Sequence, residues 1–123
     1  MSDWEDDQLA RVDGADELRI AGRLADGTLR PSVIIWHVRV GDSLYVRSVL
    51  GPEAAWFRGT QIRGEGHIDA GGVSVDVTFI RDDTKDAEID KAYFAKYGSG
   101  PDVVAITNAT ATSTTLRVEP QGD

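Results

Sequence analysis

Short stretches of alternating apolar and polar residues, separated by tight turns, are the feature that most restricts the fold of this chain. The clearest stretch runs from Val73 to Ile80, where Val75, Val77 and Phe79 alternate with polar residues. This alternation is typical of a strand with one buried and one exposed face. A similar alternation occurs at 17–24.

Turn dipeptides separate these stretches at short intervals. They are Asp26-Gly27, Gly41-Asp42 and Gly71-Gly72. Such short connections join antiparallel neighbours, because a parallel crossover needs a dozen or more residues. The expected strands are 17–24, 30–40, 44–50, 64–70, 73–80, 102–106 and 114–119. The pattern predicts a mainly β fold, an antiparallel barrel of six to seven strands with helices at its rim.

A short N-terminal helix is expected before the first strand. Ser2 and Glu5 have the spacing of a capping box, with Ser2 as the cap. This spacing predicts a helix from Asp3 to Arg11. Residues 51–63 interrupt the β pattern, and we expect a loop with a helical turn there.

A second helix is expected before the last strand. Asp83 or Thr84 is a suitable cap for its first turn, and the helix is expected to end near Tyr97. Gly98 follows as a C-terminal cap, because glycine adopts the left-handed conformation at low cost. Within this helix, Ile89 and neighbouring apolar residues form one stripe.

The size and composition of the chain restrict its class. With 123 residues, one domain spanning 1–123 is expected, with a helical lead-in at 1–16 and a tail at 120–123. The absence of cysteine excludes disulfides and thiolate metal sites. No apolar run approaches the roughly 18 residues of a membrane helix. The acidic start lacks the features of a signal peptide, so we expect a cytoplasmic protein with no membrane partner.

Charge is distributed unevenly along the chain. The net charge is −8, with −5 in residues 1–16, +2 in 17–66 and −5 in 67–123. This balance argues against nucleic acid as a partner. All seven basic residues of the middle segment are arginines, which suit bidentate contacts to phosphate or carboxylate. They are Arg19, Arg23, Arg30, Arg39, Arg47, Arg58 and Arg63.

The two histidines give no metal motif. His37 and His67 lack the close spacing of histidine ligands, so no metal site is expected. A serine–histidine–aspartate triad stays open, although no nucleophile-elbow motif accompanies either histidine. From its strand position, His37 is expected to be half-buried with one hydrogen-bond partner.

The segment from Ile35 to Ser48 resembles the split barrels that bind flavin or deazaflavin. These are the pyridoxamine-phosphate-oxidase-like proteins and the deazaflavin-dependent nitroreductases. The resemblance rests on a Trp-containing strand, a Gly-Asp turn and the run Leu44-Tyr45-Val46-Arg47-Ser48. Flanking segments at 23–30 and 48–57 extend it. From about residue 4 to 120, the chain is most similar to a bacterial domain-of-unknown-function family of this type.

The resemblance implies a split β-barrel and a set of site residues. The residues expected to bind the flavin mononucleotide (FMN) or deazaflavin (F420-type) cofactor are Arg23, Arg30, Arg47, Ser48, Trp56 and Arg58. His37 and Tyr97 are expected to act on the substrate as proton donors. Since relatives hold the cofactor between subunits, the resemblance also implies a homodimer.

Two functions are consistent with the sequence. The first is a small oxidoreductase that transfers hydride from a bound flavin or deazaflavin to a small organic substrate. The second is a cofactor-free barrel that binds an anionic small molecule as a carrier, a sensor or a non-redox enzyme. Both require the clustered arginines to converge on one pocket.

Overall fold

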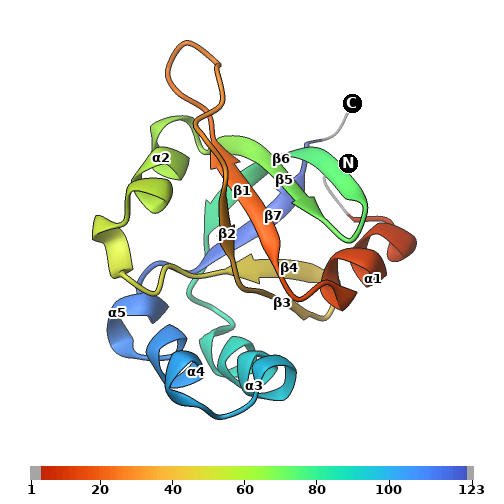
Figure 1. The fold of residues 1–123 in the computed structure, drawn as a ribbon, viewed down its shortest axis with the longest axis vertical. Helices are drawn as coiled ribbons and strands as arrows, with labels where there is room; N and C mark the ends of the chain where they lie inside the picture. The colour runs from red at the N-terminus through yellow and green to blue at the C-terminus, as the bar shows by residue number, and fades with distance from the viewer. Residues whose placement is uncertain (1–3, 122–123) are drawn as a thin grey trace.

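Seven antiparallel strands form one continuous sheet in the computed structural model, which describes residues 4–121. The strands are β1 (Leu18–Gly22), β2 (Val33–Ile35), β3 (His37–Val40), β4 (Ser43–Val46), β5 (Glu65–Ala70), β6 (Val73–Arg81) and β7 (Leu116–Pro120). The sheet curves into a nearly closed barrel with helices around it (Figure 1). The predicted fold class, mainly β with flanking helices, is confirmed.

The two edge strands of the sheet follow one another directly in the sequence. The order of the strands in the sheet is β2-β1-β5-β6-β7-β4-β3. The edge strands β2 and β3 are consecutive along the chain, and only Trp36 separates them. Since β2 pairs with β1 and β3 pairs with β4, the chain crosses from one edge of the barrel to the other at this residue. The single strand expected at 30–40 is therefore two strands.

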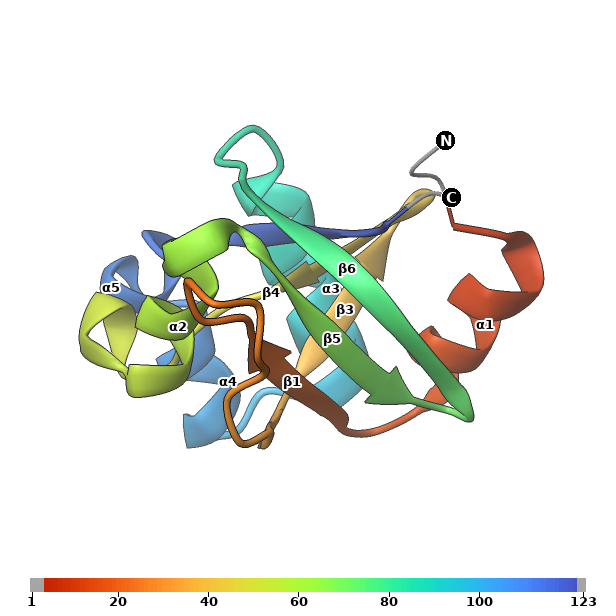
Figure 2. The ribbon, with the colours of Figure 1, turned by 90° about the horizontal axis from the view of Figure 1, so that it is seen from above.

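Within the described residues, five α-helices and one 3-10 helix surround the barrel. They are α1 (Asp6–Gly14), η1 (Gly51–Glu53), α2 (Ala55–Arg63), α3 (Asp86–Tyr97), α4 (Pro101–Ile106) and α5 (Ala109–Thr112). Seen from above, α1 lies at one end of the barrel, and α2 and α5 lie at the other (Figure 2). None of the helices in residues 4–121 is long and apolar enough to cross a membrane.

The N-terminal helix starts later than predicted. Glu5 is its N-cap and forms a capping box with Gln8; Ser2, the expected cap, lies outside the described residues. Asp83 and Thr84 do not cap α3, whose N-cap is Lys85 without a side-chain hydrogen bond. Gly98 ends α3 with φ of 90°, as expected.

The largest error of the sequence-based prediction lies at the end of the chain. Residues 102–106 were expected to form a strand, but they belong to α4. Pro101 occupies the first turn of this helix, where its missing N–H costs nothing. Helix α5 was not expected at all; Asn108 caps it by accepting a hydrogen bond from the Ala111 amide. The third strand also ends earlier than expected, at Val46.

Two apolar clusters hold these elements together. The first fills the barrel and includes Leu18, Ile68 and Val118, together with Leu9 and Val12 of α1. The second lies between the β3–β4 hairpin and helices α3, α4 and α5. Its members are Val38, Tyr45, Ile89, Tyr93, Val103, Ile106 and Ala111. The second cluster fixes the helical layer that borders the site described next.

A close approach of two glycines sets the position of α2 against the barrel. A Cβ atom on Gly22 of β1 would lie 2.6 Å from the main-chain carbon of Gly59 in α2. Any side chain at position 22 would therefore separate the helix from the strand. This contact holds α2, which carries Trp56 in its first turn, against β1.

Candidate functional site

A cleft of about 290 Å³ lies where the barrel edge at β2 meets the helical layer. Its walls are mostly apolar and include two tryptophans. The lining residues are Glu17, Ile34, Ile35, Trp36, Arg47, Val49, Trp56, Asp102 and Ile106. Ile34 and Ile35 come from β2, Trp56 comes from α2 and Ile106 comes from α4. The cleft therefore joins segments that are far apart in the sequence.

The shape of this cleft follows from the break between β2 and β3. Trp36 stacks on Tyr97 of α3, with ring centroids 4.1 Å apart and planes at 7°. This stacking anchors the bend to the helical layer. Trp56, in the first turn of α2, also lines the cleft and packs edge-on against Phe57. Trp36 therefore packs against the helical layer, whereas Trp56 packs against the barrel.

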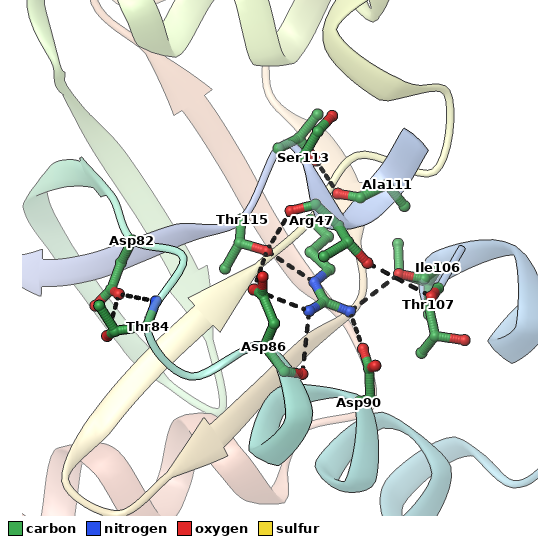
Figure 3. Close-up of polar contacts among 12 residues, drawn as sticks. Arg47, Asp82, Thr84, Asp86, Asp90, Ile106, Thr107, Ala111, Ser113 and Thr115 are labelled. Carbon is green, nitrogen blue, oxygen red and sulfur yellow. Dashed lines mark hydrogen bonds and ion pairs between the residues drawn. The ribbon is translucent and has the colours of Figure 1, made fainter. Parts of the chain in front are cut away.

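Arg47 lies in the wall between the cleft and α3, and its side chain is fully buried. Its Nη1 donates to Asp90 Oδ1 at 2.5 Å, and Nη2 lies 3.4 Å from Asp86 Oδ1. Its Nε donates to Thr115 Oγ1 at 2.9 Å. Further contacts reach the carbonyl oxygens of Asp86 and Ile106. Figure 3 shows the guanidinium at the centre of this network.

The Arg47 network joins four parts of the chain. It connects the end of β4 to α3 through Asp86 and Asp90, to α4 through Ile106 and to the start of β7 through Thr115. The two carboxylates compensate the buried positive charge, which would otherwise be costly. All three guanidinium nitrogens already donate to partners inside the protein. Arg47, expected to bind a phosphate, is therefore not available for an anionic ligand.

The other arginines of the middle segment do not converge on the cleft. Arg23 donates to the carbonyl of Gly27 and to Asp76 Oδ1, both at 2.8 Å. Arg58 is exposed on α2; two positions after Trp56, it projects from a different face of the helix, because each residue turns the helix by about 100°. The expected convergence of the arginine cluster on one pocket is wrong, because these side chains mostly pair with nearby carboxylates.

Arg30 does not line the cleft either, but it lies against α2, the helix that carries Trp56. Its side chain crosses α2 at Gly59, where a Cβ would lie 2.7 Å from Arg30 Cδ and 3.3 Å from its Nε. Gly59 follows Trp56 by three positions, so both lie on one face of the helix. Arg30 forms no ion pair within residues 4–121. It is therefore an uncompensated cation about one helical turn from a wall of the cleft.

His37 is buried away from the cleft. Its side chain is inaccessible to solvent, whereas half-burial was expected. Its Nε2 lies 2.5 Å from the carbonyl oxygen of Val12 in α1. Since a carbonyl only accepts, Nε2 carries the hydrogen and Nδ1 is unprotonated. Burial lowers the pKa of His37 to about 4, so the imidazole is neutral near pH 7.

Tyr97 and Lys96 complete the surroundings of His37. The hydroxyl of Tyr97 donates to the carbonyl of Asp16 at 2.8 Å and accepts from the His37 amide at 3.3 Å. Burial raises the pKa of Tyr97 to about 12. Lys96 donates to the His37 carbonyl at 3.1 Å. Neither expected proton donor, His37 or Tyr97, lines the cleft, and both tie α1 and α3 to β3.

Ser48, another residue expected to bind the cofactor, is also buried. Its amide donates to Thr114 Oγ1 at 2.8 Å. Its own hydroxyl has no hydrogen-bond partner within residues 4–121. Ser48 does not line the cleft, so it contributes to the junction between β4 and the segment before β7.

Sequence reasoning missed most of the lining residues. Trp56 and Arg47 were singled out, whereas Glu17, Val49 and Asp102 were not. Asp102 was placed in a strand, so its position at the start of α4 could not be foreseen. Val49 lies in the flanking segment 48–57 of the family resemblance, which was the available signal for it. Within the part of the chain that the structure describes, no group of three or more His, Asp or Glu side chains is arranged to hold a metal.

A family model described as "Uncharacterized protein conserved in bacteria (DUF2255)" matches residues 8–118. No curated protein matches the chain.

Solved structures show the same fold at low sequence identity. HutZ, the heme storage protein from Vibrio cholerae, has a TM-score of 0.67 and 12% identity, covering 93% of this chain and 87% of its own. The conserved hypothetical protein Rv2991 from Mycobacterium tuberculosis has a TM-score of 0.61 and 8% identity, with 97% and 80% covered. An F420 reductase has a TM-score of 0.54 and 13% identity, with 92% of each chain covered. At these identities the likeness establishes the split-barrel fold.

Proposed function

We propose that this chain, which belongs to the DUF2255 family, binds the ring of a flavin or deazaflavin in the cleft between β2 and α4. The observation that carries the proposal is the cleft itself, an apolar slot with Trp36 and Trp56 in its walls. The resemblance of the segment 35–48 to flavin- and deazaflavin-binding barrels supports the same ligand class. So does the shared fold with a protein named as an F420 reductase.

The cleft suits a flat ring in size and chemistry. Its volume of about 290 Å³ is close to the lower limit of ligand pockets, roughly 300 Å³. A ring system fills such a space while the remainder of the ligand stays outside. Aromatic and aliphatic walls stabilise a planar ring by dispersion and by burial of apolar area.

The phosphate of the ligand must bind to a residue other than Arg47, which was expected to bind it. Arg47 already pairs with Asp86 and Asp90, and Glu17 and Asp102 in the walls would repel a phosphate. A phosphate fits only outside the cleft. Arg30 lies there without an ion pair within residues 4–121, so we assign the phosphate contact to Arg30.

The chemistry proposed for this site is that of an oxidoreductase. The bound ring would supply hydride transfer to a small organic substrate, while the protein supplies binding and orientation. Trp56 and Trp36 hold the plane of the ring, and Ile34 and Ile106 keep water from it. His37 and Tyr97 are turned away from the cleft, so we assign them to the support of the barrel.

A second copy of the chain is the proposed cover of the cleft. Two apolar residues that line the cleft, Ile34 and Val49, are each 48% exposed. Leu50, next to Val49 in the chain, is 73% exposed, and Val104 of α4 is 56% exposed. Exposed apolar side chains mark an interaction site where they gather on one surface. A homodimer would bury these side chains and shield the ring from water.

The test is a titration with FMN and, separately, with the deazaflavin F420, followed by ring absorbance and tryptophan fluorescence. Trp56→Ala is expected to weaken binding of the preferred cofactor about tenfold by removing the aromatic wall. Arg30→Gln is expected to weaken it about tenfold or more, because one charge-assisted hydrogen bond is lost. Phe94→Ala and Arg58→Gln, which replace an exposed aromatic and an exposed arginine elsewhere, are the matched controls.

Native mass spectrometry of the same samples reports subunit number and bound cofactor together. A dimer that becomes a monomer in Leu50→Glu would support the proposed cover. A colourless protein that shows no absorbance change with either cofactor at high micromolar concentration would overturn the cofactor proposal. It would favour the cofactor-free alternative, a carrier, sensor or non-redox enzyme.

A further inference from the structure

A serine, a histidine and an aspartate form a hydrogen-bonded chain on the outer face of the barrel. His67 Nδ1 lies 2.9 Å from Asp76 Oδ1, and His67 Nε2 lies 2.8 Å from Ser74 Oγ. None of the three residues lines the cleft described above. The order of contacts, carboxylate to Nδ1 and Nε2 to hydroxyl, is the order that activates a serine in acyl-transfer enzymes.

The register of β5 and β6 creates this arrangement. His67 is the cross-strand partner of Asp76, and Ser74 precedes Asp76 by two residues on the same face. Side chains on one face of paired strands contact both the direct and the diagonal neighbour. The three groups therefore lie on a rigid hairpin, with the tight turn at Gly71 and Gly72.

The protonation pattern follows from the partners. The hydrogen bond from His67, together with the contacts from Arg23, lowers the pKa of Asp76, so Asp76 is an acceptor and Nδ1 carries the hydrogen. Nε2 of the neutral imidazole then presents its lone pair to the hydroxyl of Ser74. Arg23 Nη2 donates to the same carboxylate oxygen, Asp76 Oδ1, at 2.8 Å and helps to hold it in place.

Space for a small substrate exists next to Ser74. A hollow of about 350 Å³ is lined by Ser74, Asp69, Arg19 and the Gly71–Gly72 turn, among others. Asp69 Oδ2 lies 3.7 Å from His67 Nε2, where a negative charge stabilises the imidazolium formed when His67 takes a proton. The hollow is open and shallow, so it suits a small acyl group.

We propose that Ser74, His67 and Asp76 form a second site that hydrolyses small uncharged carboxylic esters. Ser74 Oγ attacks the carbonyl carbon and its proton moves to His67 Nε2. The ester C–O bond breaks, and His67 gives that proton to the departing alcohol oxygen. Water then attacks the acyl-serine, its proton moves to His67, and the carboxylic acid leaves as Ser74 regains a proton.

The test uses p-nitrophenyl acetate with the full chain. Release of p-nitrophenol reports turnover, and peptide mass spectrometry of briefly treated protein locates the acetyl group. We expect the acetyl group on Ser74. Ser74→Ala and His67→Gln are each expected to lower kcat/KM at least about 100-fold, the usual contribution of a nucleophile and its base. Thr78→Ala removes a hydroxyl from the same strand and face and should leave the rate unchanged.

Three results would overturn the proposal. The first is an unchanged rate in Ser74→Ala. The second is a loss of activity in His67→Gln but not in Ser74→Ala, which would show direct attack by the imidazole. The third is an acetyl group on lysine alone, with none on Ser74. The location of the acetyl group is measured on the unaltered protein, so the proposal stays testable even if a variant fails to fold.

Discussion

The Arg47 network and the Ser74–His67–Asp76 cluster contain similar groups but lie in different surroundings. In the first, a fully buried guanidinium is held by Asp86, Asp90 and Thr115. In the second, the His67 side chain is 26% exposed and Asp76 is 49% exposed. Hydrogen-bond distances in the two clusters are comparable, so distance alone does not distinguish them.

Burial decides what each cluster can do. The donors of Arg47 are used inside the protein, and loss of a partner there leaves a buried charge without compensation. The outer cluster is in contact with water, so its ion pair adds little stability, and the hydroxyl of Ser74 borders open space. The buried cluster therefore stabilises the fold, and the exposed one has groups that a ligand can reach.

Among substitutions in these two clusters, replacing Arg47 is expected to have the largest effect, and it tests the difference between the buried and the exposed cluster most directly. Arg47→Met is expected to lower the free energy of unfolding by about 1–3 kcal/mol, because the buried Thr115 hydroxyl and Ile106 carbonyl lose their donor, whereas Asp86 and Asp90, 34% and 38% exposed, can be hydrated. Urea denaturation of wild type and variant measures the difference. A loss below about 1 kcal/mol would show that water replaces the guanidinium, and the distinction between the two clusters would not hold.

The pH dependence of the free energy of unfolding should distinguish His37 from His67. Burial lowers the pKa of His37 to about 4 from an unfolded value of 6.5. The unfolded state thus binds more protons between these values, so this stabilising contribution is complete above pH 6.5 and is lost as the pH falls toward 4. The loss should be about 2–3 kcal/mol in urea denaturation at pH 7 and pH 4. His37→Gln should reduce this pH-dependent loss of stability, whereas His67→Gln should leave the loss unchanged.

The smallest expected effect is at the outer ion pair. Arg23→Gln removes the contact with Asp76, whose side chain is 49% exposed, and should cost at most about 1 kcal/mol of unfolding free energy. The measurement is the same urea denaturation as for Arg47→Met. A cost equal to that of Arg47→Met would mean that exposure does not separate the two clusters.

Much of the barrel could be predicted from the sequence, because its signals are local. The alternation of Val75, Val77 and Phe79 and the glycine turns depend only on neighbouring residues. The same holds for Gly98 at the end of α3. The strand predicted at 102–106 was wrong because a run of four apolar residues has no clear period. Burial of Val103 and Ile106 against α3 favours a helix there.

The candidate site was harder to foresee, because it depends on pairing at long range. Nothing near Arg47 in sequence shows that Asp86 and Asp90, about forty residues later, would neutralise it. The contact of Ser74 with His67 likewise depends on strand register. Trp56 and Arg30 were both expected because the family resemblance was local, whereas the path of the Arg30 side chain over Gly59 was seen only in the structure.

The contact between Gly22 and Gly59 offers a route to redesign. With no room for even a methyl group at position 22, the smallest added side chain would act as a wedge and displace α2, together with Trp56, as one body. The width of the slot could then be adjusted from outside, with every group in its walls left chemically intact. Engineering of ligand size in this barrel could therefore begin at a residue that no ligand touches.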